Sequence, residues 1–384
     1  MLRTFITIFI ASLFFAACAQ NEIVEDISSS GSTNVKVVPK EKVSFLLSDF
    51  FKEDDLLNNY IDSIFNSLSP HARVAQLIMP AIGDHGQTEA TINKLVLENK
   101  IGGVLMLNGT KNQFTNWISK YNHWNDSLNH IPFLYSADAE PSLVNRKIIN
   151  STPVKKANKL QSKKEVIEVA NTISMDLNEI GINYNFAPVV DMSPNKTVGW
   201  RSFGHEPDSV IPWSAAFVRE TQKHQVMATA KHFPGHGFVE GDTHKKLVYI
   251  DGEMKELINY PDLIKNEIMS IMIAHIAVRN NSKYSTSGLP ATTSREIVTD
   301  LLKDSLGFKG LIVTDAMNMG GVSNIKNANK LAVMAGCDIL LMPLDASKAH
   351  EDLLELYVED EDTQAEIDNS VKKIIRAKLC LGIF

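Results

Sequence analysis

The chain has 384 residues, of which 44% are hydrophobic, and a formal net charge of −7. This apolar content is typical of a globular protein, and a mildly acidic chain without a Lys/Arg run excludes the electrostatic footprint of a nucleic-acid-binding protein. The 3 cysteines are too few for a disulfide framework in so long a chain, and no Cys/His spacing indicates a zinc site. Buried free thiols are therefore expected, with a single bridge as the alternative.

Residues 1–17 are predicted to be a signal peptide of the lipoprotein type. Arg3 precedes an apolar run at 5–15, and small residues follow directly before Cys18. A charged start, an apolar stretch too short to span a membrane comfortably and small residues at its end are typical of a secretory signal. The cysteine predicts a lipid on Cys18. Simple secretion with cleavage near Ala17 and an uncleaved anchor are the alternatives.

Residues 18–42 are predicted to form a flexible tether. The segment is polar and rich in serine, so it cannot bury a core of its own. A lipid and a tether would hold the following domain, residues 43–384, at a bacterial membrane. The protein is thus expected to be exported and lipid-anchored, on either the periplasmic or the cell-surface side.

Residues 43–384 alternate short apolar runs with longer stretches of helical periodicity, such as 164–180, 212–224 and 294–306. Continuous apolar runs are typical of strands that are buried on both faces. Strands that are each followed by a helix predict an α/β fold, a single-domain (β/α)8 TIM barrel. An open doubly wound sheet is the alternative, but no Gly-rich phosphate loop follows a strand. The predicted strands are 76–82, 101–107, 131–138, 182–191, 228–233, 270–276, 310–316 and 338–343.

Titratable side chains stand at the carboxyl ends of these predicted strands. In a closed barrel such ends meet at one face, which is where barrel enzymes hold their active sites. A single acid at a strand end is often a helix cap or a loop anchor, and for Asp191 that interpretation stays equally open. The convergence of the whole set carries more weight. The set comprises Asp138, Asp191, Lys231, His232, His275 and Asp315.

Titratable side chains are most concentrated in Lys-His-Phe-Pro-Gly-His-Gly at 231–237, followed by Asp-Thr-His at 242–244. Histidine suits proton transfer near neutral pH because its unperturbed pKa is about 6.5. His244 is the candidate general acid/base, and Asp242 would orient its imidazole and raise its proton affinity. Glycines between the two motifs would let this loop swing. A solvent-exposed loop histidine is the alternative for His244.

Asp315 ends an apolar strand, where an unpaired buried charge would be costly. A carboxylate in this position can attack an anomeric carbon and hold a glycosyl ester until water releases it. An N-cap for the next helix is the alternative. Lys231 and His232 are candidate binders of sugar hydroxyls. Arg201, in the loop after the fourth predicted strand, could hold the substrate as a rigid donor fork, or it could be a surface arginine.

The motif at 231–237 with its Asp-x-His, and the Val-Thr-Asp-Ala-Met segment at 313–317, resemble glycoside hydrolase family 3 and, within it, the β-N-acetylhexosaminidases. The resemblance extends from about Ile64 to the C-terminus. It implies a nucleophile, a general acid/base with its partner, and a set of sugar-binding side chains. The implied residues are, in that order, Asp315, His244 with Asp242, and Lys231, His232, Arg201, Asp138 and Arg146.

The stretch between Asp138 and Arg146 departs from the pattern of that family. Its usual form reads Asp-Gln-Glu-Gly-Gly-Arg, and here Asp138 and Glu140 are kept while their neighbours differ. The departure leaves the shape of that side of the pocket and the substrate preference open. It does not affect the implied nucleophile or acid/base. The differing residues are Ala139, Pro141, Ser142 and Leu143.

The resemblance implies a retaining exo-β-N-acetylglucosaminidase that acts on peptidoglycan fragments or chitooligosaccharides through a glycosyl-aspartate intermediate, without a metal or other cofactor. A histidine acid/base does not repel phosphate, so phosphorolysis stays open. A β-glucosidase or β-xylosidase of the same family is one alternative, against which the Asp-x-His loop argues. A catalytically inactive, lipid-anchored glycan-binding protein is the other. Expected partners are a carbohydrate and, through the lipid, a membrane, but no nucleic acid; a monomer is expected.

Overall fold

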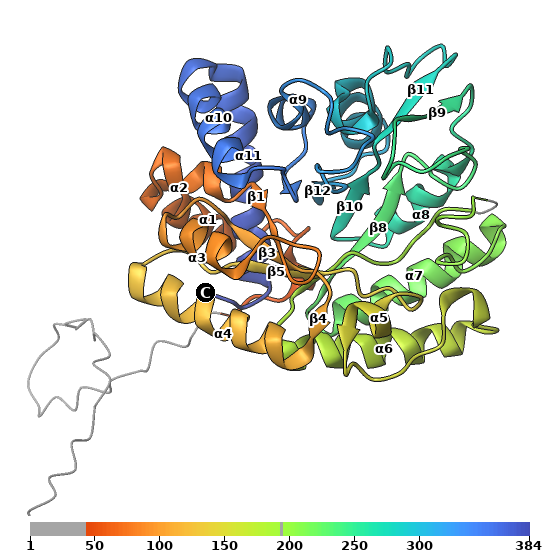
Figure 1. Ribbon diagram of the computed structural model, residues 1–384, viewed down its shortest axis with the longest axis horizontal. Coiled ribbons are helices and arrows are strands. Elements are labelled where there is room, and N and C mark those ends of the chain that lie inside the picture. Colours follow the sequence, from red (N-terminus) through yellow and green to blue (C-terminus); the bar gives the residue numbers. More distant parts are fainter. Residues whose placement is uncertain (1–43, 193–194) are drawn as a thin grey trace, which may run out of the picture. The chain divides into compact units, whose positions relative to one another are not determined.

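The computed structural model describes residues 44–192 and 195–384 (Figure 1). The predicted signal peptide, the lipid on Cys18 and the tether lie outside the described residues. Within the described part, no helix combines the length and the apolar character needed to cross a bilayer. Residues 44–384 form one compact unit.

A curled parallel sheet of 7 strands forms the centre of this unit, in the order β12-β10-β8-β7-β5-β3-β2 (Figure 1). Every residue in these strands is buried, as continuous apolar runs predict. The predicted α/β class with a parallel sheet is therefore confirmed. The strands are β2 (Ala81–Ile82), β3 (Gly103–Met106), β5 (Leu134–Ala137), β7 (Tyr184–Asn185), β8 (Met227–Phe233), β10 (Ser270–Ile273) and β12 (Leu311–Thr314).

The two edges of the curled sheet are linked through a short parallel pair, β1 (Ile78–Met79) and β13 (Leu340–Leu341). The N–H of Thr314 donates to the carbonyl of Ile339 at 3.0 Å, and that of Leu340 donates to Leu77 at 2.7 Å. On the other side, the N–H of Gly102 donates to Ile78 at 3.1 Å. Backbone hydrogen bonds thus run from β12 past β13 and β1 to the start of β3.

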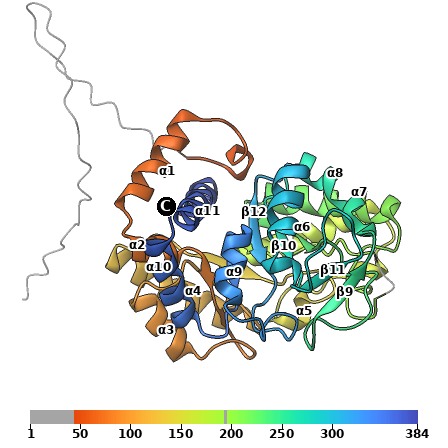
Figure 2. The ribbon, with the colours of Figure 1, turned by 90° about the horizontal axis from the view of Figure 1, so that it is seen from above.

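Helices cover the outside of the strands (Figures 1 and 2). Those predicted at 164–180 and 294–306 are observed as α6 and the π-helical segment η5. The helix predicted from 212 begins at Pro207 instead, and Pro212 lies inside it. The connecting helices are α3 (Glu89–Leu97), α4 (Lys111–Leu128), α6 (Lys163–Ile180), α7 (Pro207–Lys223), α8 (Tyr260–Lys265), η5 (Glu296–Ser305) and α9 (Ala328–Ala335), with α1 (Asp55–Ser67) and α2 (Pro70–Ala75) before them and α10 (Ala346–Glu359) and α11 (Glu361–Cys380) after them.

The last helix, α11, is fastened to the strands by buried polar groups. Asp338 accepts hydrogen bonds from Ile312 N–H at 2.8 Å and from Lys373 Nζ at 2.5 Å.

Both Cys337 and Cys380 are buried free thiols, which confirms the interpretation preferred from the sequence.

Two small strand pairs outside the main sheet were not predicted. One joins β4 (Gly109–Thr110) to β6 (Ile148–Ile149), and the other joins β9 (Val248–Asp251) to β11 (Ile276–Arg279). The β9–β11 pair matters for function because β9 directly follows the loop that carries His244. Residues 234–247 are called the His244 loop below.

Candidate active site

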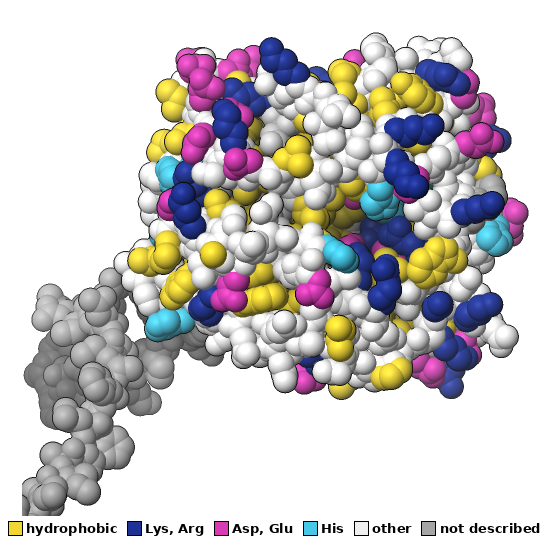
Figure 3. All heavy atoms as spheres, in the orientation of Figure 1, with side chains coloured by type: hydrophobic (Ala, Val, Ile, Leu, Met, Phe, Trp, Pro, Cys, Tyr) yellow, Lys and Arg dark blue, Asp and Glu magenta, His cyan; other side chains and the backbone are white. Residues whose placement is uncertain are grey.

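A cavity of about 470 Å³ opens where the strands of the sheet end, and the predicted site residues lie in its wall, except Asp242, which reaches the site only through its hydrogen bond with His244. In the space-filling view, a hollow near the centre of the molecule is bordered by His, Lys and Arg side chains (Figure 3). The wall brings together residues that are far apart in the sequence and belong to five different strand ends or loops. The predicted residues that line it are Asp138, Arg146, Arg201, Lys231, His232, His244 and Asp315.

Asp315 follows β12 directly and is held by the backbone around it. Its N–H donates to the carbonyl of Ile273 at 2.9 Å, and its Oδ1 accepts the N–H of Ala316 at 2.8 Å. Burial acts to raise the pKa of Asp315, but the nearby His232 and His275 and the Ala316 N–H outweigh it and hold the pKa below its ordinary value. The carboxylate is therefore ionised at neutral pH, as a nucleophile must be.

His275 supports the segment next to Asp315. The sequence indicated only that His275 lies at the end of a strand. The ring is fully buried, with Nδ1 2.7 Å from Thr292 Oγ1 and Nε2 3.0 Å from the carbonyl of Ala316. It thus fixes the backbone on the carboxyl side of Asp315. Burial acts to lower the pKa of His275, while the charge of Asp315 and the backbone of Asp315 and Ala316 oppose the shift.

His244 and Asp242 form a hydrogen-bonded pair on the His244 loop. The distance from His244 Nδ1 to Asp242 Oδ1 is 2.7 Å, and the same oxygen accepts the N–H of His244 at 3.0 Å. Because an ionised carboxylate only accepts, Nδ1 carries the proton that it donates to Asp242 and Nε2 is left for the substrate. The His244 side chain is 61% exposed, so solvent reaches the acid/base position.

Lys231 and Arg201 are bound by two carboxylates, of which Asp138 lines the cavity and Glu140 is fully buried. Lys231 Nζ lies 2.8 Å from Asp138 Oδ1 and 2.6 Å from Glu140 Oε1. Arg201 donates two hydrogen bonds to Glu140, from Nε to Oε2 at 2.9 Å and from Nη2 to Oε1 at 2.6 Å. Burial would raise the pKa of Glu140, but Arg201 and Lys231 lower it to about 2. The sequence showed that Glu140 was kept in the altered stretch but gave it no role.

Another residue that the sequence did not predict is Lys147, directly after the altered stretch. Its Nζ lies 2.5 Å from Asp138 Oδ2, so Asp138 is held between Lys147 and Lys231. Burial opposes the ionised form of Asp138, but these two cations hold its pKa well below the ordinary value. The predicted Arg146 lines the same cavity as an exposed side chain.

Asp191 contacts His232. Its hydrogen bonds decide whether it is a structural anchor, the interpretation that the sequence left open. Its Oδ2 is 2.7 Å from His232 Nδ1, while Oδ1 accepts the N–H groups of His232 at 3.2 Å and His236 at 2.9 Å. Asp191 is therefore a buried loop anchor that also orients the imidazole of His232. Burial disfavours its charge, but His232 outweighs this and lowers the pKa of Asp191.

The part of the chain that the structure describes contains no group of three or more His, Cys, Asp or Glu side chains placed to hold a metal ion. The cavity offers the carboxylate of Asp315, the exposed imidazole of His244 with its partner Asp242, and side chains held in ion pairs, among them Lys231, Arg201 and Asp138. A carboxylate nucleophile and a separate acid/base are the requirements of a retaining glycoside hydrolase.

Comparisons with known proteins find β-hexosaminidases among the relatives of this chain. The chain is 38% identical over 197 residues to the β-hexosaminidase A of Pseudoalteromonas piscicida, a match that covers 46% of this chain and 33% of that protein. It is 32% identical over 173 residues to a β-hexosaminidase of Actinobacillus pleuropneumoniae serotype 5b (strain L20), covering 42% of this chain and 49% of that one. The matches thus span between a third and a half of these curated relatives.

Among solved structures, a glycoside hydrolase family 3 β-N-acetylglucosaminidase from Paenibacillus sp. str. FPU-7 superposes with a TM-score of 0.76 at 27% identity, over 83% of this chain and 63% of that one. The model of the glycosyl hydrolase family 3 N-terminal domain matches residues 71–377. The range includes every residue of the cavity wall named above. The chain therefore belongs to glycosyl hydrolase family 3.

Proposed function

We propose that the protein is a retaining exo-β-N-acetylglucosaminidase that removes terminal N-acetylhexosamine from peptidoglycan fragments or chitooligosaccharides. The observation that carries the proposal is the presence of Asp315 and the His244–Asp242 pair at one cavity. The β-hexosaminidase and β-N-acetylglucosaminidase names of the similar proteins support the acetamido sugar.

In the first step an oxygen of Asp315 attacks the anomeric carbon as the bond to the leaving oxygen breaks, and His244 Nε2 gives that oxygen a proton. In the second step His244 takes a proton from water, whose oxygen attacks the same carbon and releases Asp315. The negative charge of Asp242 stabilises the imidazolium before the first step and after the second. Each step inverts the anomeric centre, so the product keeps the configuration of the substrate.

Lys231, Arg201 and Asp138 would bind hydroxyl groups of the terminal sugar. Their ion pairs with one another and with Glu140 and Lys147 fix these groups before substrate arrives, which reduces the entropy lost on binding. A cavity of about 470 Å³ is near the small end of ligand sites and suits one terminal sugar, which supports exo action.

A panel of 4-nitrophenyl glycosides tests the sugar. N-acetylglucosaminide hydrolysis should exceed glucoside and xyloside hydrolysis by about a hundredfold in kcat/KM, because the acetamido group needs dedicated contacts. Equal rates on the glucoside would favour the β-glucosidase alternative, and sugar binding without turnover of any donor would favour the inactive binding protein. Nuclear magnetic resonance of the first-formed anomer tests retention, and added phosphate that yields a sugar 1-phosphate would reveal phosphorolysis.

Two further features belong to the proposal. The hydrogen bonds that link β12, β13, β1 and β3 support a complete (β/α)8 barrel. The charged start, apolar run and small residues before Cys18 support a lipid-anchored, exported protein. Radiolabelled palmitate incorporation into the full chain, compared with Cys18→Ala, tests the anchor: equal labelling of both chains would contradict it.

A further inference from the structure

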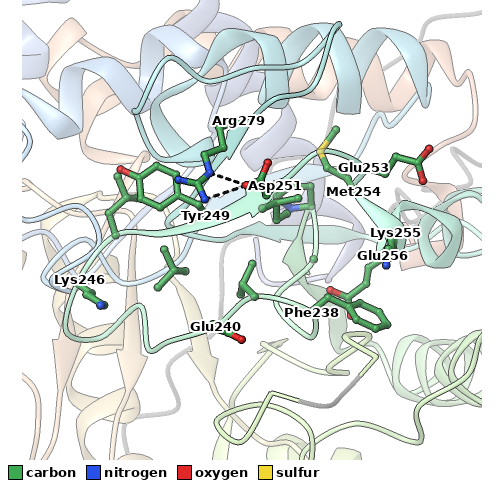
Figure 4. Close-up of a pocket in the computed structure, with 16 residues that line it drawn as sticks. Phe238, Glu240, Lys246, Tyr249, Asp251, Glu253, Met254, Lys255, Glu256 and Arg279 are labelled. Atoms are coloured by element: carbon green, nitrogen blue, oxygen red, sulfur yellow. Dashed lines mark hydrogen bonds and ion pairs between the residues drawn. The ribbon is translucent and has the colours of Figure 1, made fainter.

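A buried carboxylate, Glu256, lies behind the His244 loop and takes no part in the chemistry described above. It belongs to η3 (Lys255–Asn259), which follows β9, and it is only 3% exposed. It lines a second cavity of about 480 Å³ that the His244 loop also borders, through Phe238, Glu240 and Lys246 among others (Figure 4).

Glu256 binds two separate segments of main chain. Its Oε2 accepts the N–H of Gly237, in the His244 loop, at 2.8 Å, and its Oε1 accepts the N–H of Met192, beyond the end of β7. The fit leaves no spare room: a Cβ on Gly237 would lie 2.4 Å from Glu256 Oε1 and 1.8 Å from the carbonyl oxygen of Met192. One side chain therefore ties the start of the His244 loop to the neighbouring strand end.

The adjacent amide of the loop is held in the same way by Asp191, which accepts the N–H of His236 at 2.9 Å. Two consecutive N–H groups, of His236 and Gly237, thus point at two different buried carboxylates. Beyond them the loop runs to Asp242 and His244 without another buried carboxylate that holds its backbone N–H groups, as far as the described residues show. The start of the loop is consequently one of its anchored points; further along, Asn195 Nδ2 donates to the carbonyls of Val239 at 2.7 Å and Gly241 at 3.2 Å.

Keeping a carboxylate at this place is energetically unfavourable. Burial and the charge of Asp191 raise the pKa of Glu256 to about 8, and within the described residues no Lys or Arg forms an ion pair with it. Backbone N–H donors, which include those of Met192, Gly237 and Phe238, oppose this rise, and at neutral pH Glu256 accepts from them as a largely protonated side chain. An apolar side chain of the same size would leave these N–H groups without an acceptor.

We propose that Glu256 is a positioning residue for the acid/base step: it fastens the start of the His244 loop so that His244 is presented to a substrate bound at Asp315. This inference rests on the acid/base role proposed above for His244. It predicts that loss of Glu256 weakens proton donation to the leaving group, while the sugar pocket, which other ion pairs hold, stays intact.

The test is the leaving-group dependence of Glu256→Gln, whose amide would set an N–H against a backbone N–H. With a poor leaving group, 4-methoxyphenyl N-acetylglucosaminide, kcat/KM should fall by about tenfold or more. With 2,4-dinitrophenyl N-acetylglucosaminide, which needs no proton, it should stay within about threefold of the parent. The inhibition constant of N-acetylglucosamine should change by no more than about twofold, because the hydroxyl binders are untouched.

Glu253→Gln is the matched control, since this exposed residue borders the same cavity and undergoes the same substitution. It should follow the parent on both donors. His244→Ala provides the reference for an acid/base defect and should show the steepest dependence. If His244→Ala shows none, the proposed acid/base role is wrong and the role of Glu256 fails with it. If His244→Ala shows it but Glu256→Gln slows both donors equally, only the inference about Glu256 is overturned.

Loop anchoring can also be measured directly, because Lys245 and Lys246 provide trypsin sites in the His244 loop. Cleavage there should be several-fold faster in Glu256→Gln than in the parent or in Glu253→Gln. Should Glu256→Gln fail to fold, Gly237→Ala breaks the same contact from the loop side and must show the same leaving-group dependence. Its absence in a folded Gly237→Ala protein would equally contradict the proposal.

Discussion

The backbone N–H of Gly320 donates a hydrogen bond to the carbonyl oxygen of His244 at 3.0 Å. The N–H of Gly321 makes the equivalent bond to Thr243 at 2.9 Å. The segment after Asp315 is thus joined through main-chain atoms to the loop that carries His244. The relative position of the proposed nucleophile and acid/base depends on this contact as well as on the start of the loop.

Gly320→Ala should impair catalysis more than binding. An added Cβ would lie 2.4 Å from the carbonyl oxygen of Lys245, so the His244 loop must shift away from the segment after Asp315. We expect kcat on the 4-methoxyphenyl donor to fall by about tenfold or more, with little change in the melting temperature. Steady-state kinetics and a thermal scan measure both. Unchanged kcat would show that this contact does not position His244.

Asp315→Asn should reduce kcat by about a thousandfold or more, because an amide cannot form the glycosyl ester. The affinity for N-acetylglucosamine, measured by calorimetry, should be largely retained. A 2-fluoro glycosyl donor should leave a covalent adduct on Asp315 of the parent protein, which intact mass and peptide mapping detect. An adduct on another residue, or near-normal turnover of Asp315→Asn, would contradict the assignment.

Asp242→Asn should shift the pH dependence as well as the rate. The Asp242 carboxylate accepts a hydrogen bond from His244 Nδ1. Burial acts to raise the pKa of Asp242, but the side-chain and backbone hydrogen bonds from His244 outweigh it and hold the pKa below the ordinary value. Without that charge His244 loses its proton more easily, so the alkaline limb of kcat/KM should move to lower pH. We expect a loss of about ten- to a hundredfold at neutral pH. An unmoved alkaline limb would argue against the pair.

Glu140→Gln should destabilise the fold in a pH-dependent manner. The folded pKa of about 2 lies below the ordinary value of 4.5, so the carboxylate stabilises the folded state above about pH 4.5 and loses this effect as the pH falls toward 2. The contribution is on the order of 3 kcal/mol at neutral pH. Removing the charge also leaves the buried Lys231 and Arg201 with one carboxylate fewer.

Urea denaturation at a series of pH values measures this effect as the free energy of unfolding. The difference between the parent and Glu140→Gln should be largest at neutral pH and should shrink between pH 4.5 and 2. Glu253→Gln serves again as the exposed control. A difference that is constant over the whole range would mean that the lost contacts of Glu140 are steric and not ionic.

The sequence predicted all strands of the curled sheet because each is a continuous apolar run, but it made most of them too long. The run at 182–191 is a strand only at Tyr184–Asn185. The residues after it, up to Asp191, belong to no named strand and connect β7 to the site. The β9–β11 pair was missed because each strand is short and the pairing joins distant segments. The prediction that a helix begins at Pro212 was wrong. It was made because proline is favoured at the first position of a helix and is usually excluded from its interior.

What the sequence determined by itself is the parallel α/β fold and the residue types of the site, because apolar runs fix strands and carboxyl ends of parallel strands collect the polar residues that follow them. Only the tertiary structure decided the pairing of charges: Glu140 with Arg201 and Lys231, Asp138 with Lys147, and Glu256 with the backbone of Gly237. The physical reason is that each of these contacts except the local one to Lys147 joins separate elements, and the distance between such elements is set by the curl of the sheet.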